Sequence, residues 1–377
     1  MKKISKYRVD YLILIPLIMF ALISIITIYS AQNLLPSYMN NLVFKQILWY
    51  IIGFIFAYFI MFIGNKFIYN NIWILYIIGV VSLLFLLMFA TPINDAKCWF
   101  SLPFGIGNIQ PSEFMKIILI FALSRTINEF NEKYNNPTIK EEFQLLFKVG
   151  LIVLIPSFLT FLQPDTGVVI IYLVITIVML FISGIRYRWF GLLFGSLGII
   201  IGFILTLYFI NTELFIKILG TDFFLRVDRL LDWSQKSGYQ LENGLTAIGS
   251  GGILGFGINN TPIYFPEPQT DFIFAVFASN FGFIGVIILL SLIVLFDVCL
   301  IKMVLKSNSM INKYIIAGII GMLIYQQFQN IGMTFGLMPI TGITLPFISY
   351  GGSSLISYMI MAGVIFSISN DTIRYTN

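Results

Sequence analysis

The stretch YLILIPLIMFALISIITIYSA, residues 11–31, carries no charged side chain and is long enough to cross a lipid bilayer as a helix. A membrane-spanning helix needs roughly 20 mainly apolar residues. A basic start precedes the stretch, but no cleavage site of small residues follows it. We therefore expect a retained first membrane helix and not a signal peptide.

The same pattern recurs along the chain. The sequence is 58% hydrophobic and 10% charged, with a mean hydropathy of +0.93, whereas roughly a quarter of the residues of a soluble domain are charged. We expect an all-α polytopic membrane protein that forms one integral domain over residues 1–377, with about ten transmembrane helices. The expected spans start near Tyr11, Val43, Asn71, Ser112, Leu146, Gly167, Trp189, Asp271, Tyr314 and Phe347.

Charge predicts the orientation of these spans. Lys and Arg crowd cytoplasmic loops, and most of the 22 basic residues fall on the side of the N-terminus when the spans are threaded in order. Both termini are therefore expected in the cytoplasm, and a large loop of about residues 211–270, between the seventh and eighth spans, is expected outside. This excess of basic residues on the cytoplasmic side accounts for the net charge of +5. We therefore expect contact with anionic membrane lipids and no nucleic-acid partner.

The usable chemistry is restricted. The chain has no histidine, so the commonest general base and metal ligand is absent. Cys98 and Cys299 are expected on opposite sides of the membrane, which argues against a disulfide between them. Carboxylates, Lys, Arg and hydroxyl groups must supply any catalysis.

Ionisable groups are costly in a bilayer, so those at span ends are candidate functional residues. Glu113 and Lys116 are three apart, on one face of a helix whose first turn suits Pro111 and which Ser112 or Gln110 could cap. A buried ion pair that fixes helix packing and direct contact with substrate are both open.

Two further segments separate apolar spans on the outer side. Asp165, in the turn Gln163-Pro-Asp-Thr-Gly167, either caps the following helix or binds substrate or metal. The glycine-rich stretch 249–257 either approaches a ligand through its backbone or forms a flexible or tightly packed re-entrant turn.

Asp271 stands where the long loop meets the eighth span. It either caps that helix or acts as a general base, because the helix dipole favours its charged form and partial burial disfavours it. The last outer loop, residues 338–354, is rich in Pro, Gly and hydroxyl residues. Such non-helical backbone at membrane depth packs in protein or lines a wet cavity, and we expect a cavity that opens outward.

These segments resemble the SEDS (shape, elongation, division and sporulation) family over almost the whole chain. The matching segments occur in the order of the family: Gln110-Pro-Ser-Glu113, Gln163-Pro-Asp165, Gly238-Tyr-Gln240, Ala247-Ile-Gly-Ser-Gly-Gly252, Thr270-Asp-Phe-Ile-Phe274 and Leu345-Pro-Phe-Ile-Ser-Tyr-Gly-Gly-Ser-Ser354. Residues 328–334 and 336–343 look more like the elongation branch than the division branch.

The resemblance implies a ten-helix protein of the bacterial cytoplasmic membrane. It also implies a peptidoglycan glycosyltransferase that polymerises lipid II at the outer face, with a class B penicillin-binding protein as partner, and Asp271 as its catalytic residue. Trp99 matches the outer-loop tryptophan of the family. The candidate substrate-binding residues are Trp99, Glu113, Lys116, Asp165, Arg226, Arg229, Glu267, Ser349 and Ser353.

The chain also departs from the family pattern. Gln269 stands where many members have histidine, and Ser279 and Asn280 replace an acidic pair. Glu267 and Asp271 are untouched by these departures.

In the expected reaction, Asp271 accepts a proton from the acceptor 4-hydroxyl as that oxygen attacks and inverts the donor anomeric carbon. Arg226, Arg229, Lys116 or a Mg²⁺ or Mn²⁺ ion on Asp271 and Glu267 would neutralise the leaving pyrophosphate. No nucleotide is needed, since the lipid pyrophosphate carries the energy. A lipid II flippase and a non-catalytic scaffold for the transpeptidase are the alternatives.

Overall fold

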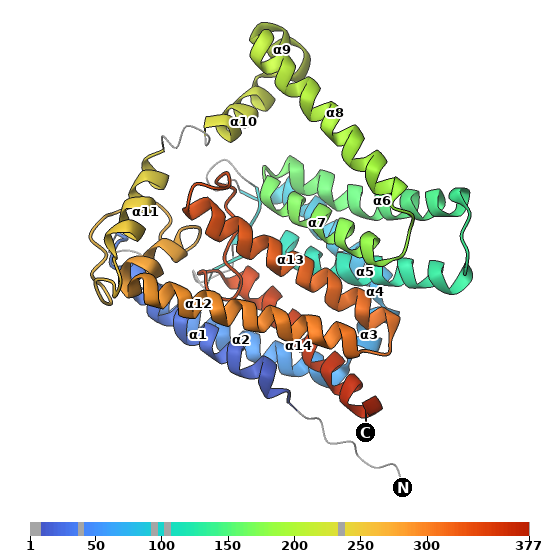
Figure 1. The fold of residues 1–377 in the computed structure, drawn as a ribbon, viewed down its shortest axis with the longest axis horizontal. Coiled ribbons are helices and arrows are strands. Elements are labelled where there is room, and N and C mark those ends of the chain that lie inside the picture. The colour runs from blue at the N-terminus through green and yellow to red at the C-terminus, as the bar shows by residue number, and fades with distance from the viewer. Residues whose placement is uncertain (1–8, 37–40, 92–96, 102–106, 233–237, 377) are drawn as a thin grey trace.

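The computed structural model describes residues 9–36, 41–91, 97–101, 107–232 and 238–376. Long helices dominate it (Figure 1). They are α1 (Tyr11–Gln32), α2 (Leu42–Ile63), α4 (Ile72–Phe89), α5 (Pro111–Lys133), α6 (Ile139–Leu162), α7 (Thr166–Ile182), α8 (Arg188–Ile210), α12 (Ile273–Lys306), α13 (Met310–Thr334) and α14 (Gly352–Thr376). Shorter elements are α3 (Asn65–Asn70), α9 (Thr212–Leu219), α10 (Thr221–Asp232), α11 (Tyr239–Ser250), and the antiparallel strands β1 (Phe100–Ser101) and β2 (Asn108–Ile109).

The expected all-α polytopic membrane fold is confirmed. Within the described ranges, seven helices are long and apolar enough to cross a membrane. The shorter apolar helix α7 and the more polar α5 and α13 coincide with the other three expected spans. The total of ten spans stays a prediction.

Three helices start several residues away from the expected span starts. Helix α13 begins at Met310 instead of near Tyr314. Helix α6 begins at Ile139 instead of near Leu146, because Thr138 and Glu141 form a reciprocal capping box that starts it earlier. Helix α14 begins at Gly352 instead of near Phe347, since Phe347 has a φ of +65° that a helix does not allow.

Close helix contacts build the bundle. Helices α2 and α14 approach each other where a Cβ on Gly363 would lie 2.6 Å from the Ala57 carbonyl oxygen. Small residues allow such approach between membrane helices. Helix α14 also contacts the segment just before α1, because the Ser369 hydroxyl donates to the Asp10 carboxylate (2.8 Å).

Helix α8 leaves this bundle and carries α9 and α10 at its far end (Figure 1). None of its residues is buried. Its start is anchored, because the Trp189 Nε1–H donates to the Glu142 carboxylate of α6 (2.7 Å). The long loop expected over about residues 211–270 therefore contains three helices, α9, α10 and α11.

Helix α12 is interrupted at Gly282, which has φ 60° and ψ −162°. The glycine-rich segment after α11 takes over the backbone groups released there. The Phe283 N–H donates to the Gly252 carbonyl (2.9 Å), and the Phe256 N–H donates to the Ser279 carbonyl (3.0 Å). Backbone groups out of contact with water need such partners. The pairing favours the packed re-entrant turn, and the alternative that the segment approaches a ligand stays a prediction.

Candidate active site

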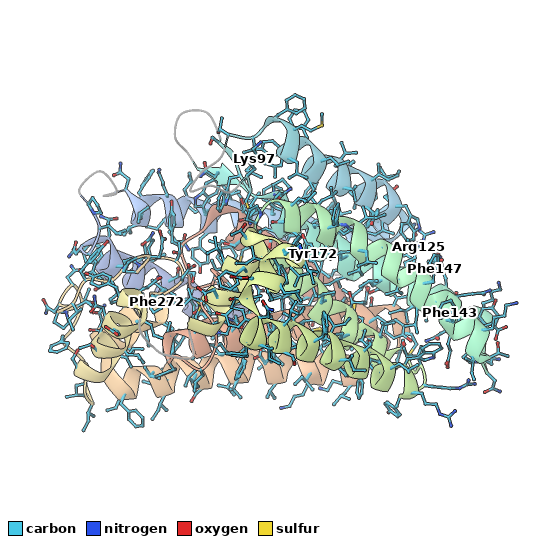
Figure 2. The ribbon with its side chains drawn as sticks, turned by 90° about the horizontal axis from the view of Figure 1, so that it is seen from above. Lys97, Arg125, Phe143, Phe147, Tyr172 and Phe272 are labelled. Atoms are coloured by element: carbon cyan, nitrogen blue, oxygen red, sulfur yellow. The ribbon has the colours of Figure 1, made fainter. Side chains whose placement is uncertain are left out.

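Asp271 lies in a short non-helical segment directly before α12. Its neighbour Phe272 lies toward one end of the molecule, whereas Arg125 and Phe143 lie toward the other (Figure 2). Figure 1 places α11 at the same end as the start of α12. The candidate catalytic residue is thus at an end of the bundle, as expected for chemistry at one membrane face.

The segment that carries Asp271 is held by its backbone. Three successive carbonyl groups accept hydrogen bonds from α13 and from the segment before α14, and this set of contacts is called the carbonyl anchor below. Its bonds run from the Tyr350 N–H to the Gln269 oxygen (2.9 Å), from the Ser349 hydroxyl to the Thr270 oxygen (2.7 Å) and from the Asn330 Nδ2 to the Asp271 oxygen (3.0 Å).

The Asp271 carboxylate is partly buried, and none of the described residues donates a hydrogen bond to it. Burial raises the pKa of Asp271 to about 7, and the nearby Glu267 charge adds to the rise. The alternative that Asp271 caps α12 was wrong, because Phe272 takes the N-cap position and no side chain caps that end. A carboxyl with a pKa near neutral suits a general base.

Glu267 has a different environment. It adopts a left-handed backbone conformation with φ 52°, and its carboxylate accepts from Thr270 Oγ1 (2.7 Å) and Gln269 Nε2 (3.0 Å). Within the described ranges, no three His, Cys, Asp or Glu residues gather as cation ligands. Mg²⁺ is usually held by one or two carboxylates together with water and substrate phosphates, so the metal role of Glu267 and Asp271 stays a prediction.

A second cluster lies at the start of α5. Lys116 Nζ is 2.7 Å from the Glu113 carboxylate, which confirms the expected ion pair. Lys116 is fully buried and its ammonium lies over the Tyr358 ring. This arrangement gives Lys116 no surface for contact with a ligand, so the packing interpretation fits better than substrate contact.

Asp165 caps α7 and also reaches α5. Its carboxylate accepts from the Val168 N–H (3.2 Å) and from Gln110 Nε2 (2.7 Å). Burial raises the pKa of Asp165 to about 6. Pro111 occupies the first turn of α5 as expected, but neither Gln110 nor Ser112 caps that helix with its side chain.

The predicted residues Trp99 and Ser353 join this cluster through Gln110. Trp99 Nε1 donates to Gln110 Oε1 (3.1 Å), and the Gln110 N–H donates to the Ser353 hydroxyl (2.9 Å). Ser353 donates in turn to the Asn108 carbonyl (3.0 Å). The structure thus uses Ser349 and Ser353 to hold backbone, and their role in substrate binding stays a prediction.

Residues 341–344, called the strap, connect the two clusters. A Cβ on Gly167 would lie 2.8 Å from the Thr341 carbonyl oxygen, and one on Gly342 would lie 3.8 Å from Asp271 Oδ2. The Thr344 hydroxyl lies 3.2 Å from the Tyr358 hydroxyl beside Lys116. The strap therefore runs from the helix that Asp165 caps to the Asp271 carboxylate.

Sequence reasoning missed the residues that tie these parts together, Gln110 and Asn330 above all. A signal was present in α13, where the amides Gln326, Gln327, Gln329 and Asn330 interrupt an apolar helix. The side chains of the predicted residues Arg226 and Arg229 lie outside the part of the chain that the structure describes.

The chain matches the "cell cycle protein" family of FtsW, RodA and SpoVE over residues 8–373. It is 32% identical to stage V sporulation protein E of Bacillus subtilis, with 97% of this chain and 98% of the relative covered. It is 27% identical to the peptidoglycan glycosyltransferase RodA of Treponema pallidum, with 96% and 97% covered.

Solved structures agree with these relatives. The rod shape-determining protein RodA of Thermus thermophilus superposes with a TM-score of 0.68 at 25% identity, over 96% of this chain and 97% of that chain. A chain from a peptidoglycan synthase complex that coordinates polymerisation and crosslinking shares the fold, with a TM-score of 0.78 at 24% identity, over 97% and 99%. The chain belongs to the SEDS family of cell cycle proteins that includes FtsW, RodA and SpoVE.

Proposed function

We propose that the chain is a peptidoglycan glycosyltransferase that polymerises lipid II into glycan strands at the outer face of the bacterial cytoplasmic membrane. The observation that carries this proposal is Asp271, a partly buried carboxyl with a raised pKa at one end of the bundle. Relatives named peptidoglycan glycosyltransferase support it.

Asp271 supplies the base in this reaction. Its carboxylate accepts the proton of the acceptor 4-hydroxyl, the hydroxyl oxygen bonds to the donor anomeric carbon, and the lipid pyrophosphate leaves with the bonding electron pair. The anomeric configuration inverts in this single displacement. A base with a pKa of about 7 is half-deprotonated near neutral pH, which is where general-base catalysis is most efficient.

The leaving pyrophosphate needs positive charge. Lys116 is buried against Glu113, so this role passes to Arg226, Arg229 or a divalent cation. Polymerisation that continues in excess EDTA would support the arginines. Activity that EDTA abolishes and Mg²⁺ or Mn²⁺ restores would support the cation.

Purified protein in liposomes tests the proposal when lipid II is supplied in the leaflet that faces the outer side of the protein. Glycan polymer is the expected product. Lipid II that crosses the bilayer without forming polymer would support the flippase instead. A flippase should carry polar residues along a path through the bilayer midplane, whereas the ionisable groups of the two clusters gather around the starts of α5, α7 and α12. Absence of both activities, with retained transpeptidase binding, would support the scaffold.

We further propose that the enzyme works in cell elongation, with both termini in the cytoplasm and a class B penicillin-binding protein as the partner that crosslinks its product. Segments 328–334 and 336–343 and the likeness to RodA support this role. Rod shape restored to an elongation-defective strain would support elongation, and restored septation or spore cortex would support the division or sporulation role.

A further inference from the structure

Asn330 is the residue of the carbonyl anchor that bonds to the Asp271 carbonyl. It is fully buried in α13, and its Nδ2 group donates to two carbonyl oxygens, that of Asp271 at 3.0 Å and that of Ile343 at 2.8 Å. One amide group therefore joins the backbone of the candidate base to the strap, across 59 and 13 residues of sequence.

These two carbonyl groups depend on such a donor. Asp271 lies before the first turn of α12 and Ile343 lies in the non-helical strap, so neither carbonyl belongs to a regular helix. A buried carbonyl without a partner costs about 1–3 kcal/mol. Loss of the Asn330 amide would release both segments at once, because each would move to find another donor.

We propose that Asn330 is a positioning residue that sets the location of the Asp271 carboxylate relative to the strap. The amide touches the backbone of Asp271 and not its carboxylate, so it acts on the reaction only through the place it gives that residue. The other two bonds of the carbonyl anchor hold Gln269 and Thr270, which leaves Asn330 as the described contact that fixes the Asp271 carbonyl itself.

The position of the Asp271 backbone also determines how far the Asp271 carboxyl is buried and which charges lie near it. The titratable groups on its own segment and on neighbouring elements include Tyr264, Glu267, Tyr325 of α13, Tyr350 before α14, and the exposed Tyr239 and Glu242 of α11. Among the described groups, Glu267 is the one whose charge raises the Asp271 pKa, after burial. A loosened segment would admit water to Asp271 and bring its pKa down toward the ordinary value near 3.9.

The inference rests on the proposed glycosyltransferase activity and is tested on the full-length protein with lipid II. Asn330→Ala is expected to lower kcat by about 10- to 100-fold, since small misplacements of a reacting group cost that much, while KM changes by less than about twofold. The acid limb of its pH–rate profile should move to lower pH by about one unit or more. Asn330→Gln keeps the amide and should recover part of both effects.

Asn65 of α3 provides a matched control. It is buried, and its Nδ2 donates to the Val364 carbonyl of α14 at 3.2 Å, far along the sequence from Asp271. Asn65→Ala should lower the melting temperature in detergent and leave the acid limb in place.

These measurements decide whether Asn330 positions Asp271. An acid limb that moves in Asn330→Ala but not in Asn65→Ala supports the inference. A wild-type acid limb and kcat in Asn330→Ala would overturn it, as would equal effects in both variants. If Asn330→Ala does not fold, Asn330→Ser decides, because it removes the amide but keeps a polar side chain: a displaced acid limb in the folded Ser variant supports positioning, and a wild-type acid limb and kcat overturn it. A wild-type protein that makes no polymer would refute the proposed function itself. Failure of the proposed function can therefore be distinguished from failure of the inference about Asn330.

Discussion

The Lys116 ammonium lies 2.7 Å from the Glu113 carboxylate one turn earlier on α5, with both side chains buried. Water cannot compensate either charge at this site, so each depends on the other. The pair also lies beside Tyr358, whose hydroxyl reaches Thr344 of the strap. Its integrity therefore bears on the geometry of the whole site.

Lys116→Met should destabilise the protein strongly. The change leaves Glu113 charged and buried without its partner, which typically costs about 3–5 kcal/mol. Thermal unfolding in detergent should show the loss as a lower melting temperature or as failure to accumulate in the membrane.

Two comparisons make that result specific. Lys148→Gln removes an exposed ion pair to Glu129 (3.9 Å) and should leave the melting temperature unchanged, since exposed pairs contribute little. The double variant Glu113→Gln, Lys116→Met should recover part of the loss, because no buried charge remains. Wild-type stability and activity in Lys116→Met would show that the ion pair is needed neither for folding nor for catalysis.

Asp271→Asn should abolish polymerisation, because an amide keeps the size of the side chain but cannot accept a proton at neutral pH. Loss of a positioned base typically lowers the rate by about 10²- to 10⁴-fold. Initial rates on lipid II measure the effect, and binding to the partner transpeptidase should survive.

Glu267→Gln is the companion variant. Its carboxylate already accepts bonds from Gln269 and Thr270, so we expect a smaller loss than for Asp271→Asn. Near-normal turnover by Asp271→Asn would contradict the general-base mechanism. Equal inactivity of both variants, reversed by excess Mn²⁺, would assign both residues to a metal site.

Part of this site could be predicted from local pattern. Glu113 and Lys116 are helical neighbours, so their spacing alone placed them in contact. Asp165 precedes a helix and is followed by Thr166 and Gly167, so its cap could be expected in the same way. Hydropathy likewise placed most of the helix starts within a few residues, because an apolar run of about 20 residues has few alternatives in a bilayer.

The rest depends on contacts between distant segments. Asn330 meets Asp271 across 59 residues, and Gln110 meets Asp165 across 55. Periodicity within a helix carries no information about which carbonyl of another segment a side chain will reach. The same holds for the pairing of the glycine-rich turn with α12, which required Gly282 to break a helix that hydropathy predicts to be continuous.

The raised pKa of Asp271 predicts an unusual effect on stability. The folded pKa is about 7 and the ordinary value is 3.8. The folded state thus holds a proton that the unfolded state releases, and the stability from this group is full below about pH 4 and is lost as pH rises through about 7. Asp271→Asn should therefore melt at the wild-type temperature near pH 4 but above it at pH 8.

Melting curves of both proteins from pH 4 to pH 8 measure this difference, in which the other titrating groups cancel. A difference in melting temperature that stays constant with pH would show that the Asp271 carboxyl has the same pKa in the folded and unfolded states. Asp297→Asn is not a suitable control, because Gln327 donates to that carboxylate (3.3 Å) and the exchange would alter the bond.

Gly255→Ala should disrupt the re-entrant turn. Gly255 has φ 79°, and a Cβ there would lie 2.2 Å from the Asn280 carbonyl oxygen. Backbone atoms cannot move aside cheaply, so steric overlap adds to the cost of a left-handed conformation, about 1–2 kcal/mol. The part of α12 around Gly282 should detach from the turn, with loss of stability and of polymerisation.

Gly249→Ala separates this effect from the general cost of a methyl group. Gly249 lies in α11, and a Cβ there meets no atom within 4 Å. Alanine favours a helix by up to about 1 kcal/mol over glycine, so this variant should melt at or above the wild-type temperature and keep its activity. Thermal unfolding in detergent and initial rates on lipid II compare the two. If Gly255→Ala matches Gly249→Ala in both measurements, the backbone pairing between the turn and α12 is not needed for stability or polymerisation, because the added methyl group can be accommodated only if that pairing opens.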